Sequence, residues 1–240
     1  MNAQYLLYLY PMIFTFILSI GLAFYSWNRR EVAAGKTFSY FMIDVAFWSL
    51  VTGMLELSDS PETAFIWFKL HFISIASTPV VGLIFGLQFS HHDNQLSVWR
   101  IFLLFLIPLI TQLIIWFHFD LFITSLTFNR SGSLMLIESY HMGPLFTPHL
   151  FYSLFCTAAG LILILVEMFQ ASHIYRWQAL ALLAGALPAV IVSVWLSTFL
   201  NATMAHLLPL CFLFMGLVYA WALFRYRLLD LVPVARNMLI

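Results

Sequence analysis

Charged residues are scarce in this sequence. They make up 8% of its 240 residues, whereas a typical soluble domain carries about 25%. Hydrophobic residues account for 63% of the chain and aromatic residues for 18%. A soluble core cannot absorb this much apolar surface, so we expect lipid to be part of the solvent of this protein.

The sequence also lacks the motifs of most catalytic and metal sites. Its two cysteines, Cys156 and Cys211, lie within apolar runs and provide neither a disulfide framework nor a metal-ligand spacing. It contains no phosphate-binding loop, no His-Glu-x-x-His pair and no Gly-x-Ser-x-Gly elbow. The adjacent His91 and His92 would face different sides of a helix, which favours a solvated loop over a metal site. We therefore expect no catalytic residue, metal, cofactor or nucleic-acid partner in this chain.

Seven apolar runs are present, each long enough to cross a bilayer, which takes about 20 residues. They cover approximately residues 5–27, 38–57, 64–89, 99–118, 148–168, 177–198 and 206–224. The predicted fold class is an all-α membrane protein, a seven-transmembrane helix bundle. Small residues in 156–160 and 179–189 predict close helix packing. The last run contains no lysine, which argues against a retinal-type photoreceptor.

The basic residues predict the orientation of the bundle. Cytoplasmic loops carry an excess of lysine and arginine. If the seven runs alternate in direction, eight of the ten basic residues fall on one side of the membrane: Arg29, Arg30, Lys36, Arg100, Arg176, Arg225, Arg227 and Arg236. The N-terminus is therefore expected outside and the C-terminus in the cytoplasm.

One connection is long, between the fourth and fifth runs at residues 119–147. Two segments rich in β-forming residues flank the sequence NRSGS, in which a glycine is available for a positive φ. This pattern predicts a small β-hairpin that lies as a lid over the outer ends of the helices. The alternative is a disordered outer loop, but several apolar residues in the two segments disfavour a solvated coil: Leu126, Phe128, Leu134, Leu136 and Ile137.

Three ionisable residues fall inside the apolar runs, where charge is costly and is often paired or functional. Glu56 ends the second run and Lys69 begins the third, so the two residues are expected at similar depth and can form an ion pair. Such a pair would either hold the two helices together or anchor a ligand. Asp44 is either a hydrogen-bonded structural residue or an element of a signal relay.

Further polar and aromatic side chains fall in the outer halves of the runs. Aromatic residues at these depths often form only an interfacial belt. Polar groups that converge beneath a lid also suggest a ligand pocket. The candidate ligand-binding residues are Glu56, Lys69, Gln112, Trp116, His149, Tyr152, Trp195 and His206.

The C-terminal stretch of the sequence is amphipathic. Asp230 is a good helix N-cap, and Pro233 falls in the first turn, where its missing N–H costs nothing. Apolar residues then recur at helical spacing, as at the start of a coiled-coil seam: Leu231, Val234, Ala235, Met238 and Leu239. This pattern predicts the base of a longer cytoplasmic signalling helix, with Asp230 and Pro233 in the relay. We expect that the chain is the input part of something longer.

The sequence WALFRYRLLDLVPVARNMLI at 221–240 resembles the end of the seven-transmembrane sensor region found at the N-terminus of bacterial histidine kinases and some diguanylate cyclases. The stretch at 55–90, LELSDSPETAFIWFKLHFISIASTPVVGLIFGLQFS, and shorter ones agree in order, so the resemblance covers nearly the whole chain. It implies a two-component sensor in the bacterial cytoplasmic membrane, followed by a PAS and a kinase or cyclase module. Such proteins often carry an asparagine in helix six and an aspartate before helix seven, where this chain has Ser193 and His206.

We therefore expect a sensor domain at residues 1–227 and the start of a signalling helix at 228–240. The sensor would bind a small molecule in its outer half and signal through its last two helices to a cytoplasmic PAS/kinase-type effector, as a homodimer formed through the C-terminal helix. A small-molecule transporter is the second hypothesis, although no internal repeat is evident. A membrane anchor or dimerisation module without a ligand is the third.

Overall fold

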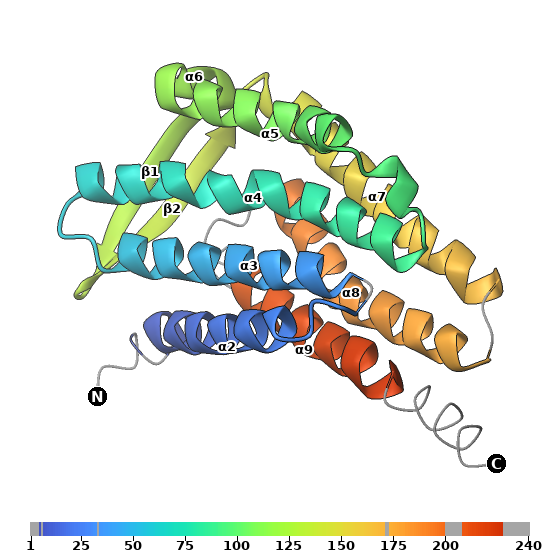
Figure 1. Cartoon of the computed structure of the whole chain (residues 1–240). Helices are drawn as coiled ribbons and strands as arrows, with labels where there is room; N and C mark the ends of the chain where they lie inside the picture. Colours follow the sequence, from blue (N-terminus) through green and yellow to red (C-terminus); the bar gives the residue numbers. More distant parts are fainter. Residues whose placement is uncertain (1–4, 6, 33, 171–172, 200–207, 228–240) are drawn as a thin grey trace, which may run out of the picture.

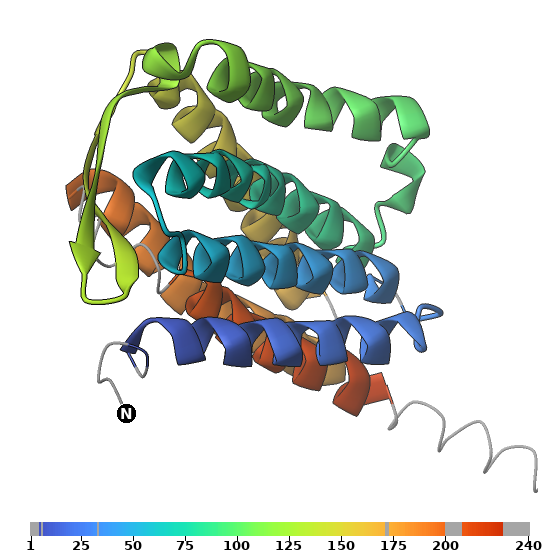
Figure 2. The same ribbon diagram turned by 90° about the vertical axis from the view of Figure 1, so that its left-hand side faces the viewer.

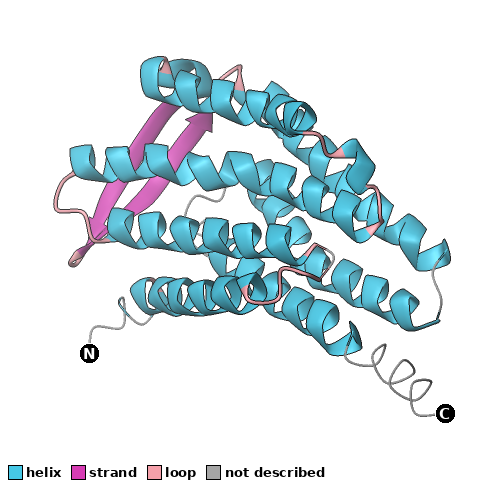
Figure 3. Cartoon of the chain, viewed as in Figure 1, coloured by secondary structure: helices cyan, strands magenta, loops and turns pink. Residues whose placement is uncertain are grey.

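The computed structural model describes residues 5, 7–32, 34–170, 173–199 and 208–227. In this part of the chain the structure is mostly helical (Figure 3). The seven long helices are α2 (Leu9–Trp27), α3 (Gly35–Glu56), α4 (Pro61–Phe89), α5 (Val98–Phe117), α7 (Phe146–Gln170), α8 (His173–Phe199) and α9 (Leu208–Arg227). The short elements are η1 (Asp93–Gln95), α6 (Phe119–Phe122), β1 (Ile123–Ser131) and β2 (Leu134–Met142).

Each predicted apolar run coincides with one long helix. Six of these helices are long and apolar enough to cross a membrane, and α9 has a shorter apolar stretch, Leu208–Phe224. The helices that the sequence predicted for a multi-pass membrane protein are therefore present in the structure. The side of the membrane that each end faces stays a prediction from the basic residues.

Six of the helices form a closed ring. In order of contact the ring is α2, α3, α4, α7, α8 and α9, and α9 returns to pack on α2 and also on α3 (Figures 1 and 2). Helix α5 lies outside this ring, against α4 and, to a smaller extent, α7. The ring encloses space between helices that are distant in sequence.

The predicted β-hairpin is present between α6 and α7. Strands β1 and β2 pair antiparallel, and Gly132 in their turn has a φ of 63°. Glycine adopts such a positive φ without strain, which is why a glycine in NRSGS predicted this turn. The hairpin crosses one end of the bundle (Figure 1), which we call the hairpin end. At its turn Arg130 donates to the carbonyl oxygen of Asp59 at 3.2 Å, and Ser133 donates to the hydroxyl of Tyr5 at 2.6 Å.

The inner face of the hairpin covers an apolar core. Ile123 and Met135 on the strands are buried with Phe68 and Phe72 of α4 and Phe122 of α6. Of the apolar strand positions noted in the sequence, Leu126, Phe128 and Ile137 pack against this core, and Leu134 is fully buried. The hairpin is therefore a packed lid, as predicted, and its position depends on the ends of α3, α4 and α5.

Helices α4 and α7 touch through their backbones. A Cβ atom built on Gly86 would lie 2.7 Å from the carbonyl oxygen of Gly160 and 2.9 Å from its Cα. A Cβ atom on Gly160 would lie 3.0 Å from the carbonyl oxygen of Gly82. A Cβ atom on Gly82 itself would meet nothing within 4 Å. Glycine is therefore required at positions 86 and 160 for this crossing, in agreement with the predicted close packing around residues 156–160.

We predict that Gly86→Ala lowers stability by about 1–3 kcal/mol, because the new methyl group meets backbone that cannot move without separating the two helices. Gly82→Ala, one turn earlier in the same helix, is the matched control, because its methyl group has open space. Thermal unfolding of the purified variants in one detergent gives the comparison. Equal unfolding temperatures for the two variants would contradict the backbone contact.

Candidate functional site

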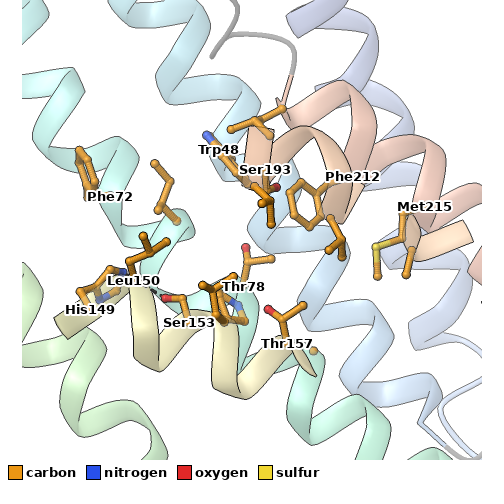
Figure 4. A pocket seen from close by; sticks show the side chains of 18 of the residues that line it. Trp48, Phe72, Thr78, His149, Leu150, Ser153, Thr157, Ser193, Phe212 and Met215 are labelled. Carbon is orange, nitrogen blue, oxygen red and sulfur yellow. Dashed lines mark hydrogen bonds between the residues drawn. The ribbon is translucent and has the colours of Figure 1, made fainter. Parts of the chain in front are cut away.

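A cavity of about 240 Å³ lies inside the ring of helices. Residues of α3, α4, α7, α8 and α9 line it, and Ile137, Tyr140 and Met142 of the hairpin line it at the hairpin end. Figure 4 shows side chains from these helices pointing into this space. The cavity is therefore the candidate ligand site of the bundle.

The cavity wall is mainly apolar. Aromatic and aliphatic side chains such as Phe72, Leu150, Phe212 and Met215 form most of it (Figure 4). None of the described residues that line the cavity is an aspartate, glutamate, lysine or arginine. The polar groups in the wall are two histidines, a tryptophan and several hydroxyl groups.

His71 of α4 is one of these histidines and is held in one tautomer. Trp48 Nε1 donates to His71 Nε2 at 3.1 Å, so this nitrogen must be an acceptor. The hydrogen of the neutral ring then lies on Nδ1, which is 3.1 Å from the hydroxyl of Thr52. That hydroxyl donates to the carbonyl oxygen of Trp48 at 2.9 Å. The network ties α3 to α4 and leaves neither ring nitrogen of His71 free.

His149, near the start of α7, has two partners as well. Its Nδ1 lies 3.0 Å from the hydroxyl of Thr111 on α5, and its Nε2 lies 3.3 Å from the hydroxyl of Ser153 one turn along α7. His149 and Ser153 line the cavity, and Thr157 continues the same face of α7 (Figure 4). A polar stripe therefore runs along α7 into the cavity.

Asp44 is hydrogen-bonded to α4, as one of its two predicted roles requires. Thr78 donates to Asp44 Oδ2 at 2.7 Å, and Ser77 donates to Oδ1 at 3.0 Å. Thr78 lines the cavity, whereas Asp44 is not among the lining residues. The second predicted role, in a signal relay, stays a prediction.

The predicted ion pair between Glu56 and Lys69 is wrong. Glu56 is 2% exposed, and neither of its carboxylate oxygens has a hydrogen-bond partner among the described residues. The ammonium group of Lys69 instead lies over the rings of Phe65 at 4.6 Å, Trp116 at 5.3 Å and Phe119 at 5.6 Å. Two residues at similar depth face different neighbours, because Lys69 points to α5 and α6 and not to α3.

Only one of the eight predicted ligand-binding residues, His149, is found in the cavity wall among the described residues. Gln112 donates to the carbonyl oxygen of Lys69 at 3.1 Å, and Tyr152 donates to that of Leu104 on α5. Six of the predicted ligand-binding residues are described by the structure but lie outside the cavity wall: Glu56, Lys69, Gln112, Trp116, Tyr152 and Trp195. His206, Asp230 and Pro233 lie outside the described residues.

The sequence analysis missed several residues of the wall: His71, Ser153, Thr157 and Tyr219. A signal for two of them was present, because Ser153 and Thr157 follow His149 at intervals of four on an otherwise apolar helix. Ser193, noted as a departure from the family pattern, is also in the wall and donates to the carbonyl oxygen of Ala189 at 2.7 Å. On the hairpin, burial raises the pKa of Tyr140, so this phenol stays neutral at ordinary pH.

No three potential metal ligands gather anywhere in the part of the chain that the structure describes. The arrangement is a mainly apolar pocket with fixed dipoles, suited to binding an apolar molecule.

A family model described as the N-terminal 7TM region of histidine kinase matches residues 11–233. The match begins within α2 and extends past the end of α9, so it includes every helix that lines the cavity. A search of curated proteins found no match to the chain.

We predict that Glu56 and Lys69 contribute to stability independently. In a double-mutant cycle of Glu56→Met and Lys69→Met, the coupling energy should stay within about 0.5 kcal/mol, as for residues without a shared partner. Glu56→Met alone should stabilise the protein, because it removes a buried carboxylate without hydrogen bonds. Unfolding in detergent measures all four proteins, with Glu138→Met on the exposed side of the hairpin as a control. A coupling energy above about 1 kcal/mol would show that the two side chains interact as an ion pair.

Proposed function

Because the chain belongs to the family of N-terminal seven-transmembrane regions of histidine kinases, we propose that it is a sensor input region that binds a small molecule in the cavity. The observation that supports this proposal most directly is that α9 lines the cavity and also leads towards the C-terminus. Phe212, Met215 and Tyr219 of α9 belong to the cavity wall. A molecule in the cavity therefore touches the helix that precedes the expected signalling helix.

Close packing makes α9 sensitive to its neighbours. Gly216 lies against the side chain of Met42 on α3, and a Cβ atom at Gly185 of α8 would lie 2.8 Å from Val218 Cγ1. There is no room for α9 to approach α3 or α8 more closely at these points. A ligand that pushes on the wall of α9 would have to slide or rotate the helix as a whole.

The far end of α9 is held by aromatic contacts. The ring of Phe224 packs edge-on against Tyr25 at 5.1 Å between centroids, and the guanidinium of Arg29 lies 3.8 Å from the centroid of the Tyr25 ring. Phe38 of α3 also contacts Phe224. A movement of α9 would disturb this cluster at the C-terminal end of the helix.

The proposal also includes the signalling route that was expected from the sequence. The signal would pass through α8 and α9 to a homodimeric C-terminal helix beginning near Asp230 and Pro233, and from there to a cytoplasmic PAS/kinase-type effector. Asp44 would contribute to the relay by coupling α3 to Thr78 in the cavity wall. A ligand can act in this way only if its affinity differs between the two states of the bundle.

A side chain that fills the cavity should act like a bound ligand. Gly82 lines the cavity and has open space at its Cβ position, so Gly82→Leu would place an isobutyl group there. We predict that this substitution changes kinase output by about fivefold or more, within the usual range of coupling between sites. The measurement is autophosphorylation in proteoliposomes of a chimera in which this chain replaces the N-terminal region of a histidine kinase of the same family.

Gly21→Leu is the matched control, since Gly21 on α2 also has open space but is not a cavity residue. It should leave the output of the chimera unchanged. If Gly82→Leu is folded and gives the same output as the unsubstituted chimera, the cavity does not control the kinase. Ligand uptake into the same vesicles would instead support the transporter hypothesis.

A further inference from the structure

Among the described residues, the cavity wall has no aspartate, glutamate, lysine or arginine that could pair with a charged ligand. The nearest candidates from the sequence do not reach it, because Asp44, Glu56 and Lys69 are absent from the lining residues. His71 and His149 each use both ring nitrogens in hydrogen bonds within the protein. A charged molecule would lose its hydration on entry and gain no compensating partner, which is a large penalty.

The hydroxyl groups in the wall fall into two sets. Thr78, Ser153 and Ser193 are engaged with protein partners. Thr157 and Tyr219 have no hydrogen-bond partner among the described residues, nor does Tyr140 at the hairpin end. Tyr219 as a whole residue is 3% exposed, and it lines the cavity. A buried hydroxyl group without a partner costs free energy unless something in the cavity binds it.

Thr157 and Tyr219 lie at a similar depth in the bundle. Gly160, one turn after Thr157, contacts α4 at Gly82 and Gly86. Phe85, in the same turn of α4, stacks on the ring of Tyr219 with 5.0 Å between centroids. Thr157 of α7 and Tyr219 of α9 therefore line the cavity at a similar depth, each with a hydroxyl group that has no partner among the described residues.

We propose that the cavity binds an uncharged amphiphile, whose single hydroxyl or carbonyl oxygen is bound by Thr157 and Tyr219. Its apolar part packs against the aromatic and aliphatic wall towards the hairpin. The volume of about 240 Å³ exceeds the roughly 150 Å³ of an engineered dry cavity that holds benzene, so a body of more than six carbon atoms fits. The ligand class can hold even if the protein is not a sensor. Only the claim that this ligand is the signal rests on the proposed function.

Photolabelling tests the ligand class. The purified chain in lipid nanodiscs is labelled with a decanol that carries a diazirine in its chain, and labelled peptides are identified by mass spectrometry. We expect labels on α7 and α9 residues that line the cavity. Decan-1-ol and decan-2-one should compete with the label, whereas decanesulfonate and decylammonium should compete at least tenfold less well at equal concentration in the membrane.

Isosteric variants test the two hydroxyl groups. Thr157→Val and Tyr219→Phe should each weaken competition by decan-1-ol by about three- to tenfold, the usual effect of losing one hydrogen bond. Ser49→Ala is the matched control, because Ser49 lies outside the cavity wall and its hydroxyl group donates to the carbonyl oxygen of Ala46 in its own helix, so this variant should bind as the unsubstituted chain does. Thermal unfolding of each variant confirms that it is folded.

The proposal is overturned if the cavity is not labelled, if a charged decyl compound competes as well as decan-1-ol, or if both hydroxyl variants bind unchanged. These outcomes are separate from those of the kinase chimera. Selective binding of the neutral compounds together with an unresponsive Gly82→Leu chimera would reject the sensor function and leave the ligand class intact. A responsive chimera whose cavity prefers decanesulfonate would support the sensor function and reject the ligand class.

Discussion

The contact between the backbones of α4 and α7 is the constraint on which the rest of this structure depends. It closes the ring of helices, since α4 and α7 are separated in sequence by α5 and the hairpin. Gly82 and Gly160, which take part in the crossing, also line the cavity. The same feature therefore holds the bundle together and shapes the wall of its candidate site. Small residues allow this approach in a bilayer, where apolar side chains gain little by leaving lipid.

Polar side chains act as connectors between particular helices. Trp48 and His71 join α3 to α4, while Thr111 joins α5 to His149 of α7. Tyr152 also reaches α5, by donating to a backbone carbonyl. Helix α5 lies outside the ring and is attached both through such bonds and through apolar packing of residues such as Leu104 and Ile115. Without water in the hydrocarbon region, each connection is strongly favoured over leaving the groups unpaired.

Local features of this protein were predictable from its sequence, and the directions of side chains were not. Apolar length predicted each long helix, and turn chemistry predicted the hairpin with Gly132 at its turn, because both depend on neighbouring residues only. The ion pair failed because depth alone does not say which way a side chain points. Lys69 and His71 are two positions apart, about 200° around a helix. Lys69 therefore faces α5 and α6 while His71 faces α3.

The residues of the cavity wall differ in how much the packing of their helices restricts them. On α9, Met215 and Tyr219 flank the tightly packed Gly216, so a substitution there alters the fit of the helix as well as the pocket. On α7, Ser153 and Thr157 lie on the cavity face and take no part in the packing of α9 against α3. A substitution at Ser153 or Thr157 would therefore change the chemistry of the pocket without changing the packing of α9. A substitution on the α9 side of the pocket also changes how that helix packs against its neighbours.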